Sequence, residues 1–330
     1  MEGVMMRSPH FFAVAVRAPN GEIVLHHEPH EKTWINRQKW IKWPFFRGAV
    51  GLIDGLVLGT KSLRFAANVQ VDPQYQKEEE GAAAPNEGKG GSEPKLGNKV
   101  VKGGDTFSNM AVMAAMIGGL GLGLFLFNYL PNALAIQAKE LGVQNPIMIN
   151  FITEIIKVVF FLGYLLGIAQ LPDIKEIFKY HGAEHMAINV IEDGEELSIE
   201  NVRKKTRLHP RCGTSFAIIV LILGMILFTF FPKPEILNNK ILTSLARFLI
   251  EIPFLPIISG VAYELIRYAG KMRNSSFVRA LFWPGLMTQY ITTAVPREDQ
   301  IEVAMVSLQT VLDLEKERAA TLETAAPAIA

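Results

Sequence analysis

Long apolar segments separated by charged ones are the dominant pattern of this 330-residue chain. Segments 107–130, 149–171, 215–231 and 242–266 are each close to the ~20 apolar residues that a helix needs to cross a bilayer. The first and third contain no charged residue, which disfavours the alternative of a water-soluble protein with buried helices. The pattern predicts a mainly α-helical, polytopic membrane protein with about four transmembrane helices.

Two of these segments contain ionisable residues, which are costly inside a bilayer and are expected to face other helices. Glu154 and Lys157 lie three residues apart and can pair on one helix face. The fourth segment contains Arg247 and Glu251. The first segment is rich in Gly and Ala, which allow close helix approach. Besides the lipid bilayer, we therefore expect a second copy of the chain or another membrane protein as a partner.

The N-terminal region, 1–71, is predicted to hold a β-hairpin and an interfacial helix. A β-branched run and a second apolar run flank a Pro-Asn-Gly turn signal, which predicts the hairpin over 11–28. Trp34, Trp40 and Trp43 are interleaved with basic residues, a mixture typical of a membrane-surface anchor. The apolar stretch after them carries charges, so we expect an amphipathic or re-entrant helix there.

The remaining chain divides by composition. Segment 72–106 is dominated by Gly, Pro and charge and is predicted to be a disordered linker. Segment 107–296 is predicted to be the membrane domain, and apolar residues at helical spacing predict a helix over 174–192 within its polar connection 172–213. In 297–330, apolar residues recur at helical spacing, which predicts an amphipathic helix docked on the cytoplasmic face.

Composition and charge predict the compartment of the protein and its orientation in the membrane. Hydrophobic residues make up 49% of the chain and the mean hydropathy is +0.22, which suits a membrane protein. A net charge of +1 and the lack of a basic face argue against nucleic acid as a partner. The start of the chain lacks the pattern of a signal peptide. Lys and Arg gather in the N-terminal region, in 172–213 and after Arg267, so both termini and the 172–213 segment are predicted to be cytoplasmic.

The motif YHGAEH, at 180–185, is the first candidate for chemistry. His181 and His185 lie four residues apart, so on a helix both imidazoles point the same way and can share one metal ion. Glu184 lies beside them, where a carboxylate can polarise a water molecule at the metal. H-x-x-E-H is the inverted zincin pattern, but five-residue patterns also occur by chance.

The motif HPRCGTSF, at 209–216, strengthens this interpretation. We expect Pro210 to begin the third span, with His209 capping it and Cys212 one turn inside. Both motifs would then meet at one membrane face. His181, His185, His209 and Cys212 are all residue types that bind Zn²⁺, and Glu184 is the candidate general base. Cys212 is the only cysteine, so no intrachain disulfide can form, and in the cytosol it stays a thiol or thiolate.

Other readings of these residues stay open. His181 and His185 can be surface histidines on a connecting helix, Glu184 a solvated charge, and Cys212 a small buried residue. Glu264 is a further candidate ligand, although we favour an interfacial charge. Gln289, Thr292 and Thr293 form an expected polar turn without an assigned role. His26, His27 and His30 are expected to be solvent-exposed at the end of an edge strand.

The chain resembles the YqhQ-like family of bacterial polytopic membrane proteins, described as predicted metal-dependent enzymes. The matching stretches are MEGVMMR at 1–7, PFFRG at 44–48, YHGAEH at 180–185, HPRCGTSF at 209–216, YE at 263–264 and the TT…P…EVA pattern at 292–304. Met186 and Val295 depart from the family pattern, and neither is a proposed ligand. The resemblance implies a multi-pass protein of the bacterial cytoplasmic membrane, with a metal site on His181, Glu184, His185, His209 and Cys212.

Three functions remain open from the sequence. The first is a metal-dependent hydrolase, which needs an open coordination position beside its protein ligands. The second is a non-catalytic scaffold or membrane-protein biogenesis partner with a closed, structural metal site. The third is a transporter that uses the charges inside the spans, which the lack of a visible repeat disfavours. Whether the protein is an enzyme is not decided by the sequence.

Overall fold

The computed structural model describes residues 2–29, 46–76, 95–96, 114, 117–119, 121–232, 239–271 and 275–325. Its N-terminal part is an antiparallel sheet of β1 (Gly3–Arg7), β2 (Phe11–Arg17) and β3 (Ile23–Pro29). The β2–β3 pair confirms the predicted hairpin. β1 was not predicted, because Val4 is its only β-branched residue. His26 on β3 is half-buried against Phe65 rather than exposed, since its ring lies 5.1 Å from that ring.

The described part of the segment predicted as a linker contains two short elements. These are the 3₁₀ turn η3 (Pro73–Tyr75) and the strand β4 (Lys95–Leu96), which pairs in parallel with β3. The rest of the predicted linker, His30 and the tryptophan-rich segment with Trp34, Trp40 and Trp43 lie outside the described residues.

The sheet is buried on both faces, which explains why β2 is a continuous apolar run. Phe12, Val14 and Val16 point to α1 (Phe46–Val71). Ala13 and Ala15 point to α5 (Pro172–Glu192) and α11 (Glu298–Ala325). These alanines are small enough for α11 to approach the strand, and the Ser307 hydroxyl donates a hydrogen bond of 3.0 Å to the Ala13 carbonyl. The two predicted helices in 174–192 and 297–330 are confirmed.

Among the described residues, four helical stretches are long and apolar enough to cross a membrane, which confirms a mainly helical chain with four candidate spans. They are Ile117–Gln137, Pro146–Ile168, Gly213–Phe230 and Leu245–Ala269. The second and third are α4 (Pro146–Ile168) and α7 (Gly213–Phe230). The fourth comprises the end of α8 (Lys240–Glu251), the 3₁₀ turn η5 (Ile252–Phe254) and most of α9 (Leu255–Lys271).

The first span ends later in the chain than predicted. A π-helical turn, η4 (Phe125–Tyr129), leads directly into α3 (Leu130–Glu140). The Leu130 N–H bonds to the Phe125 carbonyl across this widened turn. Pro131 follows within the first turn of α3, where a missing N–H is tolerated, so the helix continues through it. Residues 131–140 are therefore helical, and the connection to α4 shortens to 141–145.

The charged residues inside the spans pair with one another, as predicted for Glu154 and Lys157. The Lys157 Nζ lies 3.1 Å from the Glu154 Oε1 and 2.7 Å from the Glu251 Oε2. The Asn128 amide donates a bond of 3.0 Å to that same Glu251 oxygen. Arg247 is buried beside this group on α8. The pairing joins α4, α8 and the π turn.

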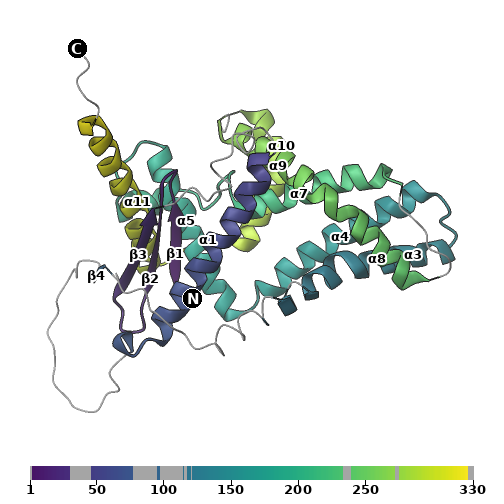
Figure 1. Cartoon of the computed structure of the whole chain (residues 1–330), viewed down its shortest axis with the longest axis horizontal. Helices are drawn as coiled ribbons and strands as arrows, with labels where there is room; N and C mark the ends of the chain where they lie inside the picture. Colours follow the sequence, from purple (N-terminus) through teal and green to yellow (C-terminus); the bar gives the residue numbers. More distant parts are fainter. Residues whose placement is uncertain are drawn as a thin grey trace.

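The two ends of the molecule are built from different elements (Figure 1). The sheet, α5 and α11 gather at one end, and α3, α4 and α8 extend to the other. α1 lies beside α9 at its start and against the sheet at its end. A Cβ atom on Gly48 would lie 2.7 Å from the Tyr263 Cβ, so only glycine permits this approach. α1 is not among the described helices that are long and apolar enough to cross a membrane.

Two further helices complete the described chain. α6 (Ile199–Lys204) is a short helix after α5. α10 (Ser276–Thr292) ends with the residues expected to form a polar turn, so that expectation is wrong. Gln289 and Thr292 are helical and Thr293 is the C-cap residue, and the Thr292 and Thr293 hydroxyls donate to carbonyls one turn earlier, at 3.3 and 2.6 Å.

Candidate metal centre

Three side chains from two motifs converge at the junction of α5 and α7. His181 and His185 lie on α5, and Cys212 is the N-cap residue of α7. One potential ligand atom from each lies within 4.8 Å of the others. The Cys212 Sγ is 3.2 Å from the His181 Nε2, and the two imidazole centroids are 4.4 Å apart. The chain therefore brings together three of the four predicted ligands.

Main-chain carbonyls fix the orientation of both imidazoles. The His181 Nδ1 lies 2.8 Å from the Thr292 carbonyl, and the His185 Nδ1 lies 2.6 Å from the Arg207 carbonyl. A carbonyl oxygen can only accept, so each Nδ1 must carry the hydrogen. Each Nε2 is then the nitrogen left to bind a metal or a proton. Such a carbonyl contact is the usual outer support of a metal-binding histidine.

A glycine brings the Thr292 carbonyl to His181. A Cβ atom on Gly182 would lie 2.1 Å from the Ala294 carbonyl oxygen, which no larger residue could allow. The Ala294 N–H donates a bond of 2.9 Å to the Phe178 carbonyl on the same face of α5. The glycine of YHGAEH thus lets the chain after α10 lie directly on the histidine helix.

Gln289 holds the second motif in place, a role that the sequence did not reveal. It is fully buried on α10. Its Oε1 accepts the His209 N–H at 2.8 Å, and its Nε2 donates to the His209 carbonyl at 2.7 Å. The same Nε2 donates to the Ser215 hydroxyl at 2.6 Å. One side chain therefore satisfies the main chain of His209 and ties it to the start of α7.

Asn189 supports the chain just before His209 and was also missed. It lies two turns after His181 on α5, and its amide donates to the carbonyls of Thr206 and Leu208 at 2.8 and 3.2 Å. Arg207, between them, supplies the carbonyl that holds His185. The spacing of Asn189 from His181, which places both on one face of α5, was the one sequence signal that could have identified Asn189.

His209 lies beside the three-residue cluster but turns toward another partner. Its ring centroid is 5.7 Å from that of His185, and its Nε2 lies 3.2 Å from a Glu192 carboxylate oxygen. Arg211 also contacts Glu192. The predicted helix start is wrong, because the Gln289 amide holds His209 before the helix and α7 begins at Gly213. A ligand role for His209 stays a prediction.

Charge within the cluster favours a thiolate. Burial alone would raise the pKa of Cys212, but hydrogen bonds from His181 and His185 and their charges outweigh it and lower the pKa to about 4. Burial would lower the pKa of His181, and the hydrogen bond to Cys212 instead raises it to about 9. Without a metal, the two side chains thus form a thiolate–imidazolium pair at neutral pH.

Glu184 lies on α5 between the two histidines and is half-buried. Burial raises the pKa of its carboxyl, and the nearby charges of His181 and His185 only partly oppose this. A carboxyl whose pKa is moved upward toward neutrality can both accept and donate a proton. Glu264, the further candidate ligand, pairs with Arg47 on α1 through both carboxylate oxygens.

Comparisons with known proteins agree with the sequence resemblance. A family model described as "Protein of unknown function (DUF1385)" matches residues 43–314. The chain is 30% identical over 319 residues to "Uncharacterized protein YqhQ" of Bacillus subtilis (strain 168), covering 96% of this chain and 91% of that protein. No solved structure matches. The chain therefore belongs to the DUF1385 family, and it is similar to YqhQ of Bacillus subtilis.

Proposed function

We propose that this protein is a membrane enzyme that holds a zinc ion with His181, His185 and Cys212 and hydrolyses its substrate. The observation that carries the proposal is the orientation of the two imidazoles. Carbonyl contacts at both Nδ1 atoms leave the Nε2 atoms to bind a metal, and the His181 Nε2 lies 3.2 Å from the Cys212 Sγ. One ligand atom from each of the three residues lies within 4.8 Å of the others. Two imidazole nitrogens and a thiolate form a donor set that Zn²⁺ prefers, so the residues fit the ion.

The number of converging ligands favours an enzyme over a structural site. Structural zinc sites are closed by four protein ligands, whereas catalytic ones keep a position open. The His209 Nε2 faces Glu192, which leaves three protein ligands in the cluster. A zinc ion held there would supply Lewis acidity and lower the pKa of water. Glu184 would take the proton from the attacking water and return it to the leaving group.

The proposal includes a location. The site would face the cytoplasm of a bacterial cell, with both termini on that side of the cytoplasmic membrane. This is supported by the concentration of Lys and Arg in 172–213 and in the terminal regions, and by the Bacillus relative.

A second candidate function rests on the charge of the cluster. A thiolate beside an imidazolium, 3.2 Å apart, is also the arrangement of a cysteine nucleophile. In that case His181 would act as the acid and base partner of Cys212, and no metal would be needed.

Metal content decides between the two. The full chain, purified in detergent without chelators, is expected to hold about one zinc per chain. His185→Ala and Cys212→Ser are expected to lose it. His27→Ala is the matched control, because this histidine lies on β3 away from the cluster. A wild-type protein without metal, with a Cys212 that reacts rapidly with iodoacetamide, would overturn the zinc enzyme in favour of the nucleophile.

A further inference from the structure

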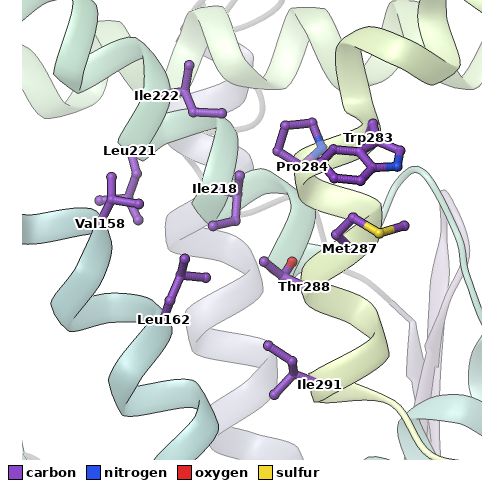
Figure 2. A pocket seen from close by; sticks show the side chains of 10 residues that line it. All are labelled: Val158, Leu162, Ile218, Leu221, Ile222, Trp283, Pro284, Met287, Thr288 and Ile291. Atoms are coloured by element: carbon purple, nitrogen blue, oxygen red, sulfur yellow. The ribbon is translucent and has the colours of Figure 1, made fainter. Parts of the chain in front are cut away.

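An apolar groove opens between α4, α7 and α10 (Figure 2). Its volume is about 340 Å³, within the range of small-molecule sites. Val158 and Leu162 line it from α4, Ile218 and Ile222 from α7, and Trp283 and Ile291 from α10. Trp283 is 58% exposed, so the groove is open on that side.

The groove offers little to a polar ligand. Apart from the Trp283 indole, Thr288 is the one lining side chain with a polar group. The Thr288 hydroxyl already donates a hydrogen bond of 2.7 Å to the Gly285 carbonyl. No charged residue is among the described residues that line the groove. A ligand bound here would therefore be held by apolar contact, as a hydrocarbon chain is.

The surroundings of the groove favour a lipid as the source of that chain. Two of its three walls, α4 and α7, belong to helices able to cross a membrane. Beside such helices the medium is lipid rather than water. Hydrocarbon chains are therefore the molecules present at highest concentration at the mouth of the groove.

One end of the groove reaches the candidate metal centre. Ile291 immediately precedes Thr292, whose carbonyl holds the His181 ring. Ile218 follows Cys212 by six residues, a rise of about 9 Å along α7. Ile222 and Trp283 lie at the opposite end of the groove in Figure 2. Both helices thus lead from the metal centre into the membrane part of the molecule, α7 with rising and α10 with falling residue number.

We propose that the groove holds the hydrocarbon chain of a lipid substrate, whose polar end lies at the candidate metal centre. This rests on the proposed function and narrows its substrate to lipids with a carboxylic or phosphoric ester near the headgroup. Hydrolysis would add water across that ester, with the hydroxyl going to the carbonyl carbon or phosphorus and the proton to the leaving oxygen. The chain would remain in the groove while the ester reacts.

Two photoreactive forms of phosphatidylglycerol test the orientation. One carries a diazirine at the end of an acyl chain, and the other carries it in the headgroup. Each is added in trace amounts to the full-length protein in detergent, with unlabelled phosphatidylglycerol as competitor. The chain-end probe is expected to label α7 and α10 near Ile222 and Trp283. The headgroup probe is expected to label the 206–214 segment and Thr292.

Neighbouring valines give matched variants. Val158 lines the groove, whereas Val159 is 60% exposed outside it. Val158→Phe is expected to reduce the competed labelling by both probes by about tenfold, because the ring takes the place of part of the chain. Val159→Phe should leave it unchanged. If Val158→Phe does not fold, Ile222→Phe against Ile226→Phe makes the same comparison on α7.

The outcomes separate this inference from the zinc proposal. Labelling that the competitor does not reduce, or that Val159→Phe reduces equally, overturns the lipid site. Metal content is measured in the same preparations. Bound zinc without groove labelling overturns the lipid inference alone. Groove labelling without zinc overturns the zinc enzyme, and with it the substrate role of the groove.

Discussion

At the scale of single residues, His181 and His185 take their orientation from main-chain carbonyls of other segments. The carbonyls belong to Thr292 and Arg207, so side-chain changes at these two positions would leave the supporting bonds in place. What must be preserved is the path of the chain that carries those carbonyls. Gln289 and Asn189 hold the path around Arg207 and His209.

Gln289→Leu should therefore damage the site without touching a ligand. The leucine would leave the buried N–H and C=O of His209 without partners, at about 3 kcal/mol of unfolding free energy. The temperature of thermal unfolding and the zinc content of the purified protein are both expected to fall. Gln309→Leu, on an exposed face of α11, is the control and should change stability by less than about 0.5 kcal/mol. A Gln289→Leu protein with wild-type stability and zinc would contradict this account of the loop.

The charge state of Cys212 gives a prediction for metal-free protein. Hydrogen bonds from the two histidines outweigh burial and lower its pKa to about 4, so the thiolate should persist as the pH falls to about 5. The ultraviolet absorbance of the thiolate, with Cys212→Ser as the blank, measures this directly because no other cysteine is present. In denaturant the same thiol should ionise near pH 8.5. A midpoint near 8.5 in the folded protein would show that the histidines do not stabilise the thiolate.

Residue roles were predictable from the sequence only where they depend on local spacing. The i,i+4 histidines of α5 fall on one face as predicted. The contacts of Gln289 with His209 and of Glu264 with Arg47 join positions 80 and 217 residues apart. No periodicity links such distant positions, so these contacts could not be predicted from the sequence.

At the scale of helices and strands, hydropathy placed the spans because lipid contact demands long apolar surfaces. α4 and α7 begin and end within three residues of their predicted bounds. The first span was predicted to end at residue 130, whereas the helix continues through Pro131 after the π turn. The end of α10 was taken for a turn because its polar residues face a buried loop rather than solvent.

The charged cluster that joins α4 and α8 should be required for stability. Lys157 lies between the carboxylates of Glu154 and Glu251 and is itself buried. Lys157→Met would leave these carboxylates without its charge in an apolar region and is expected to cost about 4 kcal/mol. Unfolding in detergent measures the loss, and Lys175→Met, an exposed position on α5, is the control. Equal stability of the two variants would show that the cluster contributes little.

At the scale of the whole molecule, the sheet links three distant parts of the chain. β1 to β3, α5 and α11 share one apolar core, so they must lie on one side of the membrane. In the part of the chain that the structure describes, two candidate spans lie between the sheet and α5, and two lie between α5 and α11. Elements that share one core lie on one side of the membrane, so the number of spans between them must be even. This agrees with the orientation predicted from the distribution of Lys and Arg.

Reporter fusions test this orientation. A fluorescent protein at the C-terminus is expected to fluoresce, and alkaline phosphatase fused there should be inactive, because that end is predicted to face the cytoplasm. Alkaline phosphatase inserted in the 141–145 connection between α3 and α4 should be active. Phosphatase activity at the C-terminus would place the shared core, and the candidate metal centre with it, on the outer side.

Zinc K-edge X-ray absorption of the purified full-length protein tests the central claim most directly. The account predicts one sulfur neighbour at about 2.3 Å and two imidazole nitrogens at about 2.0 Å, with one further light atom in the open position. The sulfur must come from Cys212, because it is the only cysteine, and Cys212→Ser should remove that shell. Bound zinc without a sulfur neighbour, or zinc that His185→Ala retains with unchanged neighbours, would contradict a metal centre at these three residues.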